Sequence, residues 1–362
     1  MKICKSCIND PELKSMIDFK TKGNCSFCNR KDTYIYDTDV DYNENLVNSL
    51  EEFFDIYTVD KSLPPEFPSK KKRRLQDEIF TNWKLFNVNT QEEVYEIITS
   101  ICSKKYKDNK DLFDNLVGIP ELIDENFLQH NLIIKKNSWD EFCNTLKNNI
   151  RFHIDYINLN ILDSILNKSI KILPKHSRFF RARISPNNQK YDCDKMGAPP
   201  CTMATDGRAN PAGISYLYLS DKYDTTAYEV RASINDYITI GEFFSKEKLK
   251  LVDLSNIDKI SPFCGINQTI YAINLEILKS ISNNISKPIN NTDLKLDYLP
   301  TQYIVDFIKS KGYDGIEYNS TLSPDTSKNF AIFDESKLIC SETTLYKLEL
   351  KYSFNKISDE DY

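Results

Sequence analysis

Three side chains suited to binding an anionic, ring-bearing ligand lie close together in one stretch of the sequence. Arg208 lies in a loop-like segment, Tyr218 lies near the end of the apolar run that follows, and Glu229 lies in a helix-like segment. Arginine can hold phosphate oxygens with two hydrogen bonds, an aromatic ring can stack on a planar group, and a carboxylate can stabilise developing positive charge. If the apolar run is a buried strand, these groups meet at one end of a sheet and form a site for such a ligand.

A second group of reactive side chains lies near the N-terminus. Cys4 and Cys7 form one CxxC pair, and Cys25 and Cys28 form a second pair after 17 intervening residues. This spacing predicts a tetrahedral four-sulfur zinc site, and four thiolates leave no open position, so the zinc would be structural. The alternative is four unrelated thiols. The other cysteines of the chain, which has ten in all, are expected to be ordinary thiols.

Composition limits the class of protein. The chain has 362 residues, of which 40% are hydrophobic, so it can form two or three domains with substantial cores. A formal net charge of −6 gives no general attraction to nucleic acid or anionic membranes. No apolar run is long enough to span a bilayer, and the first residues lack the apolar core of a signal peptide, so we expect a cytoplasmic protein without membrane contact.

We expect three regions: a zinc-ribbon-like module over 1–35, a mostly helical regulatory or interaction domain over 36–168, and a catalytic domain over 169–362. Periodic apolar residues predict helices over Val47–Phe54 and Glu92–Ile101. A third helix is predicted to begin after Ser138 and to continue through Ile150 and Ile154.

A basic run, Lys70 to Arg74, follows a proline-containing segment. It could contact phosphate or an acidic partner, but a solvated loop or helix start is the favoured interpretation. Nucleic acid is not excluded as a partner of this run or of the zinc ribbon. The helical region could also mediate homo-oligomer formation.

Helices and strands are mixed in the last region without a strict strand–helix–strand rhythm, which favours an α+β fold. Helices are expected over Asn267–Ile281 and from Leu299 to a C-cap at Gly312. The expected strands share alternating or continuous apolar residues and lie at Ile170–Leu173, Phe179–Ile184, Tyr237–Gly241, Leu249–Leu254, Gly315–Tyr318 and Asn329–Phe333.

From about Ser177 to Leu338 the sequence resembles the RES domain, named for an Arg, a Glu and a Ser. The segments that carry the resemblance include Arg181 in FFRARI, GRANPAG at 207–213, LYLS at 217–220, TAYEVR at 226–231, GYDGIEYNS at 312–320 and NFAIFD at 329–334. The chain departs from the family pattern at Ala209, where many members have an aromatic residue, and at Asn319, where Pro is common.

The resemblance implies a fold similar to that of ADP-ribosyltransferases and a bacterial toxin or defence effector that consumes NAD⁺. Family members cleave the nicotinamide–ribose bond by hydrolysis or phosphorolysis, and some transfer ADP-ribose to protein. Short members are neutralised by a helix-turn-helix antitoxin, whereas longer members such as this chain could be controlled differently. NAD⁺ as substrate, structural Zn²⁺, and an antitoxin or regulatory protein are therefore the expected ligands and partners.

The resemblance also gives roles to individual residues. Glu229 is expected to stabilise the positive charge that develops on the ribose as nicotinamide leaves. Arg208 would clamp phosphate. Arg181 would be a second clamp or would orient Glu229. Ser320 would donate a hydrogen bond to phosphate or nicotinamide, and no histidine lies near it to make it a nucleophile.

Strand periodicity leaves two choices open. Arg183 shares a strand face with Arg181, and Tyr216 shares one with Tyr218, so only the family position favours Arg181 and Tyr218. Tyr218 would contact nicotinamide or ribose. Two further residues, Asn210 and Gly213, would shape the cofactor-binding loop, the latter with a positive φ.

Two other functions remain as alternatives. The first is a mono-ADP-ribosyltransferase that modifies a protein or nucleic acid with the same residues. The second is a non-catalytic binding module in which the zinc ribbon is the active surface, so that Cys4→Ser would abolish function and Glu229→Ala would not. The helical region lacks the Arg and His spacing of a HEPN ribonuclease, because Arg151 and His153 are too close, and we expect a sensor, dimerisation or regulatory module there.

Overall fold

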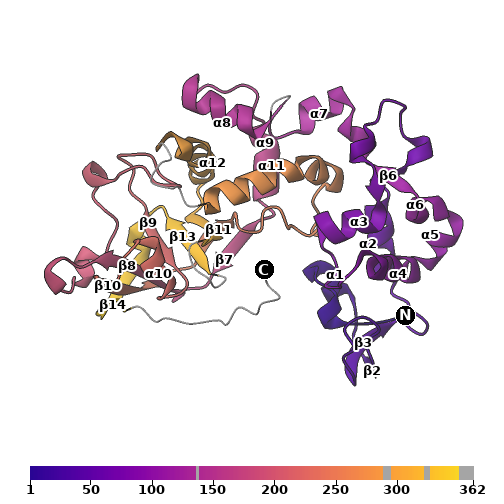
Figure 1. Cartoon of the computed structure of the whole chain (residues 1–362), viewed down its shortest axis with the longest axis horizontal. Helices are drawn as coiled ribbons and strands as arrows, with labels where there is room; N and C mark the ends of the chain where they lie inside the picture. The colour runs from indigo at the N-terminus through magenta and orange to yellow at the C-terminus, as the bar shows by residue number, and fades with distance from the viewer. Residues whose placement is uncertain (136–137, 288–294, 322–326, 350–362) are drawn as a thin grey trace, which may run out of the picture. The chain divides into compact units, whose positions relative to one another are not determined.

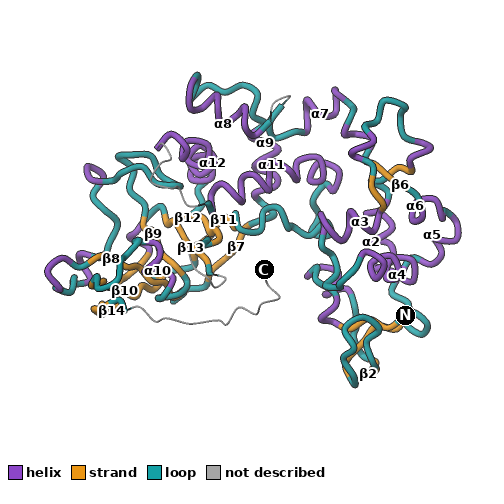
Figure 2. Tube along the Cα trace, viewed as in Figure 1, coloured by secondary structure: helices purple, strands orange, loops and turns teal. Residues whose placement is uncertain are grey.

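The computed structural model describes residues 1–135, 138–287, 295–321 and 327–349, which fall into two compact units. The first unit comprises Met1–Trp139, His153–Lys168 and Asn256–Lys279, and the second comprises Asp140–Phe152, Ser169–Ser255 and the residues from Ser280 onward. Figure 2 shows that the first unit is mainly helix and loop, whereas most strands belong to the second. Within the described ranges, no helix combines the length and apolar character needed to cross a bilayer.

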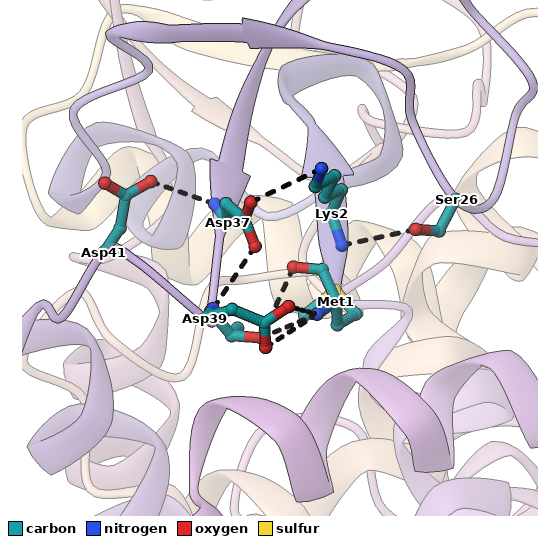
Figure 3. Close-up of polar contacts among 7 residues, drawn as sticks. Met1, Lys2, Ser26, Asp37, Asp39 and Asp41 are labelled. Carbon is teal, nitrogen blue, oxygen red and sulfur yellow. Dashed lines mark hydrogen bonds and ion pairs between the residues drawn. The ribbon is translucent and has the colours of Figure 1, made fainter.

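The cysteine pairs lie beside a small antiparallel sheet, and of the four cysteines Cys4 belongs to one of its strands. Its order is β1 (Lys2–Cys4), β3 (Thr33–Asp37), β2 (Thr21–Gly23). Figure 3 shows polar contacts that join the start of the chain to the end of β3, among them an ion pair of 3.7 Å between Lys2 Nζ and Asp37 Oδ2. These contacts hold β1 against β3 and so fix Cys4 at the end of its strand.

Helices make up most of the remaining first unit. They are α1 (Pro11–Met16), α2 (Glu44–Phe54), α3 (Leu75–Glu78), α4 (Gln91–Ile101), α5 (Ser103–Asp108), α6 (Lys110–Asp114), α7 (Glu125–Asn131) and α9 (Leu159–Leu166). The two helices predicted from apolar periodicity are confirmed as α2 and α4. Thr90 and Glu93 form a capping box at the start of α4, and the buried face of α2 includes Leu50 and Phe53.

A second small sheet has the order β4 (Thr58–Val59), β6 (Leu116–Gly118), β5 (Arg73–Arg74). The favoured interpretation of the basic run as a solvated loop or helix start is confirmed, because its residues other than Lys72 are exposed and Arg74 is the N-cap of α3, although Arg73 and Arg74 also form β5. Arg73 and Arg74 pair with Val117 and Leu116, because the edge of β6 offers backbone hydrogen bonds to this extended segment.

Residues 256–279 come late in the sequence but pack within the first unit. Helix α11 (Gln268–Ser286) contributes its residues up to Lys279 to this unit. Asn274 is fully buried: its Oδ1 accepts a hydrogen bond from the Ile133 amide at 2.7 Å, and its Nδ2 donates to the Asn131 carbonyl at 2.8 Å. Its helical neighbour Tyr271 packs with Trp83 at a ring-centroid distance of 5.7 Å.

The second unit is built on an eight-stranded sheet of order β14-β10-β8-β9-β13-β12-β11-β7. Of its neighbouring pairs, only β11 and β12 run parallel. The strands are β7 (Ile170–Leu173), β8 (Arg178–Ile184), β9 (Leu217–Ser220), β10 (Tyr237–Ser245), β11 (Leu249–Asp253), β12 (Gly315–Asn319), β13 (Lys328–Ile332) and β14 (Leu338–Lys347). With helices α8 (Trp139–Asn148), α10 (Thr225–Glu229) and α12 (Leu299–Ser310), this confirms the α+β class.

The two faces of the large sheet carry different residues. One face holds an apolar core that includes Phe179, Leu219 and Phe330. On the other face, Ala227 of α10 packs with Phe180 against the cluster around Ala182, Ile238 and Ile240. Because directly paired residues share a face, the register Phe180–Ser220–Asn329–Tyr318 forms a row across β8, β9, β13 and β12 on the α10 side.

Two predicted boundaries are wrong. The helix after Ser138 ends at Asn148 and does not continue through Ile150 and Ile154. Asparagine favours helix ends, and Arg151 Nε donates to the Leu146 carbonyl at 3.3 Å, which satisfies a free acceptor of the last turn. Helix α11 runs five residues beyond the predicted Ile281, to Ser286. Gly312 follows α12 with a φ of +80°, as the C-cap prediction requires.

Candidate functional site

The four N-terminal cysteines converge on one point. The Sγ atom of Cys4 lies 3.8 Å from that of Cys7 and 3.5 Å from that of Cys28, and the Sγ atoms of Cys7 and Cys25 lie 3.7 Å apart. All four lie within 4.8 Å of one another. A tetrahedral zinc ion with Zn–S bonds of about 2.3 Å separates its sulfurs by about 3.8 Å. The cluster could therefore hold a zinc ion.

In the second unit, the loop before β9 is organised by Asn210. This side chain is 3% exposed, and its Nδ2 donates to the carbonyls of Thr205, Pro211 and Ile214 at 3.0, 3.2 and 2.7 Å. Its Oδ1 accepts a hydrogen bond of 2.6 Å from the Tyr218 hydroxyl. Because both ends of the amide are engaged, Asn210 shapes the loop and has no donor left for a ligand.

Two glycines allow the loop to close. A Cβ at Gly207 would lie 2.5 Å from Asn210 Oδ1 and 2.7 Å from the Tyr218 hydroxyl oxygen, so a larger residue there would disrupt their hydrogen bond. Gly213 has a φ of +85°, in the region that favours glycine, which confirms the predicted positive φ.

Helix α12 holds the backbone of the same loop. Thr301 Oγ1 donates to the Arg208 carbonyl at 2.7 Å, and Gln302 Nε2 donates to the carbonyls of Gly207 and Asn210, both at 2.9 Å. With Thr301 and Gln302 both buried, these bonds have little competition from water. The helix thus fixes the point from which the Arg208 side chain extends.

The Arg208 guanidinium lies over a buried ring. Its Cζ is 5.9 Å from the ring centroid of Tyr318, and one of its terminal nitrogens donates to the Ser286 carbonyl at 3.4 Å. Among the described residues no carboxylate forms an ion pair with Arg208. Its charge and its remaining N–H donors are therefore available to an anionic ligand.

Glu229, the last residue of α10, is held by two neutral donors. Its Oε1 accepts hydrogen bonds from Ser320 Oγ at 2.9 Å and from Asn329 Nδ2 at 2.7 Å. Ser320 follows β12, and Asn329 lies in β13 with 3% of its surface exposed. The structure thus brings Glu229 and Ser320 together, although sequence reasoning had directed Ser320 toward a ligand.

Tyr318 connects the two charged groups. Burial raises the pKa of its hydroxyl, the positive charge of Arg208 opposes that rise, and the negative charge of Glu229 adds to it. Arg208 lies over the Tyr318 ring. Asn329, which donates to Glu229, is paired with Tyr318 across β12 and β13. Together with Ser320 these residues form one polar cluster on the α10 side of the sheet, and this cluster is the candidate active site.

The two tyrosines that sequence periodicity could not separate have different surroundings. Tyr218 donates to Asn210 and accepts a hydrogen bond of 3.2 Å from the Ala209 amide, so its hydroxyl belongs to the loop. Tyr216 packs against Phe333 at a ring distance of 4.8 Å and lies under Lys309 Nζ at 4.7 Å. Of the two, Tyr218 belongs to the loop that carries Arg208.

Arg181 lies apart from the Glu229 cluster. It pairs with Gly241 across β8 and β10, and strand alternation directs it to the face opposite Phe180. One of its terminal nitrogens is buried without a hydrogen-bond partner among the described residues. Burial, with a smaller contribution from Arg183, lowers the pKa of Arg181 to about 10. Arg183 itself is exposed and lies over the Tyr191 ring at 5.1 Å.

Two members of the cluster, Asn329 and Tyr318, were not identified as site residues from the sequence. Asn329 lies in the apolar run NFAIF, and a lone amide in such a run is a signal that could have been used. Buried polar side chains need partners, so an asparagine in a central strand points to a polar group facing it. Tyr318 gave no such signal, because a tyrosine is ordinary in a strand.

The part of the chain that contains this cluster matches a known protein family. Residues 178–349 match the model of the RES domain. A chain of the crystal structure of the M. tuberculosis MbcT–MbcA toxin–antitoxin complex is similar over 51% of this chain and 93% of its own length, with 12% identity and a TM-score of 0.31. No curated protein sequence matches the chain. The family-model match thus assigns a RES domain to residues 178–349 of the chain.

Proposed function

We propose that the RES domain cleaves the nicotinamide–ribose bond of NAD⁺ and that the protein is a toxin or defence effector. The observation that carries this proposal is the arrangement at Glu229. The Glu229 carboxylate accepts hydrogen bonds from two neutral donors, and the Arg208 guanidinium, which pairs with no carboxylate among the described residues, lies over the ring of Tyr318. NAD⁺ joins a pyrophosphate to a positively charged nicotinamide ring, and this pair of charges complements both groups.

In the proposed reaction the bond between ribose C1′ and the nicotinamide nitrogen breaks, and its electron pair leaves with nicotinamide. The ribose gains oxocarbenium character, which the Glu229 carboxylate stabilises, and an oxygen of water or phosphate then bonds to C1′. Water releases one proton to the solvent in this step and gives ADP-ribose, whereas hydrogen phosphate gives a phosphorylated ADP-ribose. Ser320 and Asn329 hold the carboxylate in place, and Arg208 binds the pyrophosphate.

Arg181 has a separate proposed role. Its buried, unpaired nitrogen lies on the other side of the strand from the Glu229 cluster. We therefore assign Arg181 one of two roles: it stabilises the sheet near Tyr218, or it binds a part of the ligand far from the reacting bond. Among the described residues the partners of the Glu229 carboxylate are Ser320 and Asn329, so its orientation does not depend on Arg181.

The test is to incubate the purified full-length chain with NAD⁺, with and without phosphate, and to measure free nicotinamide. Release by the wild type and loss of release in Glu229→Gln would support the proposal. No release by the wild type under either condition, together with unchanged NAD⁺ in cells that express it, would overturn it. NAD⁺ labelled in the adenylate part distinguishes macromolecular ADP-ribosylation, because label would then appear in a protein or nucleic acid.

The full-length chain is the right material for this assay. A chain lacking residues 1–165 would still contain Asn256–Lys279, which pack within the first unit. Tyr271 and Asn274 would lose Trp83 and Ile133 as partners and would expose buried surface. Loss of activity in such a truncation could therefore reflect misfolding.

We further propose that the cysteine cluster binds one structural zinc ion. Three of the four cysteines are buried, and the sulfur spacing matches a tetrahedral site. Metal analysis of the purified protein should give about one zinc per chain. Cys25→Ser should lose this metal and lower the melting temperature. A stoichiometric zinc content in that variant would contradict the assignment.

A further inference from the structure

The first unit contains a cavity that is separate from the RES site. Its volume is about 340 Å³, and all of its lining residues belong to the first unit. The walls are formed by β5 and β6, the π-helical segment Ile79–Trp83, α7 and the first part of α11. Figure 1 labels α3, β6, α7 and α11, each of which contributes residues to this lining. Cavities of this size are typical of small-molecule sites.

The polar part of the lining is mainly positive. The cationic side chains that line the cavity are those of Lys70, Lys71, Arg73 and Lys279. The carboxylates of the lining belong to Glu78 and Glu276. The chain as a whole has a formal net charge of −6, so this local excess of positive charge is opposite to the overall balance. A concave, positive surface attracts and concentrates small anions.

Hydrogen bonds already engage part of this charge. Arg73 Nε lies 3.5 Å from Glu78 Oε1, and Glu78 Oε2 accepts a hydrogen bond of 2.6 Å from Asn82 Nδ2. Lys279 Nζ donates to Asn82 Oδ1 at 2.9 Å. The network fixes one wall of the cavity. Lys70 and Lys71 are exposed and pair with no carboxylate among the described residues, so their ammonium groups are available to a ligand.

The rest of the lining is apolar or aromatic. Ile119, Leu128 and Ile273 represent the aliphatic part. Trp83 and Tyr57 are both buried, and Trp83 Nε1 donates to the Tyr57 hydroxyl at 2.7 Å. Inorganic phosphate alone would leave this apolar surface in contact with water. A ligand that fills the cavity needs both an anionic group and an organic part.

We propose that this cavity binds a small organic phosphate, with the phosphate at Lys70 and Lys71 and the organic part over the apolar wall. In this proposal the basic run binds a ligand that takes no part in the reaction proposed for the RES domain. Side chains alternate between the two faces of β5, so Arg73 lines the cavity and its neighbour Arg74 does not. The proposal is independent of the reaction proposed for the RES domain.

The experiment measures binding of AMP and of ribose 5-phosphate to the full-length protein by calorimetry, with inorganic phosphate as the reference. All measurements use the Glu229→Gln background, so that turnover does not interfere. We expect at least one of the two organic phosphates to bind with a Kd below about 1 mM and more tightly than inorganic phosphate. The double variant Lys70→Glu and Lys71→Glu should weaken that binding at least about 10-fold.

Arg74→Glu is the matched control, because it reverses one charge of the same run outside the cavity. It should leave affinity within about 2-fold of the parent. Both changed lysines are exposed, so the double variant should keep its melting temperature. Absence of binding by both organic phosphates would overturn the proposal, and so would equal affinities of the parent and the double variant, which would place binding at another site.

Discussion

Two glutamates near the same pair of strands have opposite environments. Glu317 of β12 is 1% exposed, and its carboxylate oxygens lie 2.9 and 2.7 Å from Lys171 Nζ. Glu229 of α10 lies over the other face, where it contacts neutral Ser320 and Asn329. The adjacent residues Glu317 and Tyr318 point to opposite faces, so one strand separates the two carboxylates.

The difference favours one of the two carboxylates as the candidate to act on a ligand. The charge of Glu317 is already balanced by a lysine, so an approaching cation would gain little from it. The charge of Glu229 is oriented by hydrogen bonds and is not neutralised, so positive charge that develops in a bound substrate can interact with it. In this sheet the buried ion pair has a structural role, and the carboxylate with neutral partners is the candidate for chemistry.

The largest effect should come from exchanging these carboxylates for amides. Glu229→Gln should lower the rate of nicotinamide release about 10³-fold, because the amide lacks the charge while its oxygen can still accept both hydrogen bonds. Glu317→Gln is the matched control and should retain the rate within about 3-fold. Equal losses in both variants would show that the contrast between the two sites is incorrect.

Removal of one neutral donor should have the next largest effect. Asn329→Ala leaves Ser320 as the remaining partner of Glu229, and misplacement of the carboxylate should lower kcat about 10²-fold with little change in KM. Asn329→Asp should be more damaging, because it places a second negative charge 2.7 Å from Glu229 Oε1. Unchanged kcat in both variants would exclude Asn329 as a positioning residue.

Arg208→Lys should affect binding more than chemistry. Lysine keeps the positive charge but loses the planar pair of donors that grips phosphate oxygens. We expect KM for NAD⁺ to rise about 10-fold and kcat to change less. Steady-state kinetics separate the two quantities, and a fall in kcat at constant KM would instead place Arg208 next to the reacting bond.

The smallest effect concerns stability and pH. Burial raises the pKa of Glu317 despite Lys171, so the folded state binds this proton more readily than the unfolded state does. Its contribution to stability is therefore greatest below the unfolded pKa and falls as pH rises through the folded value. Relative to wild type, Glu317→Gln should gain stability in denaturant titrations as pH rises above the ordinary glutamate pKa of 4.5. An opposite slope would mean that the ion pair outweighs burial.

At pH 7 the stability of Glu317→Gln should lie within about 1 kcal/mol of wild type. The reason is that Lys171 is 44% exposed, so water can solvate its ammonium group when the carboxylate is removed. A much larger destabilisation would indicate that this ion pair holds β7 in the sheet.

Sequence reasoning succeeded where local pattern and structure agree. The apolar periodicity of α2 and α4, the glycine that follows α12, and the strand before Ser185 are set by neighbours in sequence. The motif also selected Glu229 and Arg208, and the fold brings both into the cluster around Tyr318, whereas their catalytic and binding roles stay predictions. The long edge strand β14 was missed because most of its residues are polar and show no clear alternation with apolar ones. Its pairing with β10 along its length makes it a strand.

Non-local contacts explain the remaining differences. Ser320 and Asn329 approach Glu229 from 91 and 100 residues away, so no spacing rule predicts their contact. The period-two rule correctly placed Arg181 and Arg183 on one face but could not tell that the first is half-buried, with one terminal nitrogen shielded from water, and the second exposed. The assignment of Asn256–Lys279 to the first unit depends on long-range packing at Trp83 and Asn274, which local composition does not encode.

This last arrangement has a consequence for synthesis on the ribosome. Protein domains usually fold as units while the chain emerges from its N-terminal end. Here Tyr271 and Asn274, which complete the first unit, are made only after β7, β8, β9, β10 and β11 of the second unit. Until then Trp83 lacks its contact with Tyr271, and the Ile133 amide lacks its hydrogen bond to Asn274. The N-terminal unit, although translated first, should therefore be completed late, when much of the RES sheet has already left the ribosome.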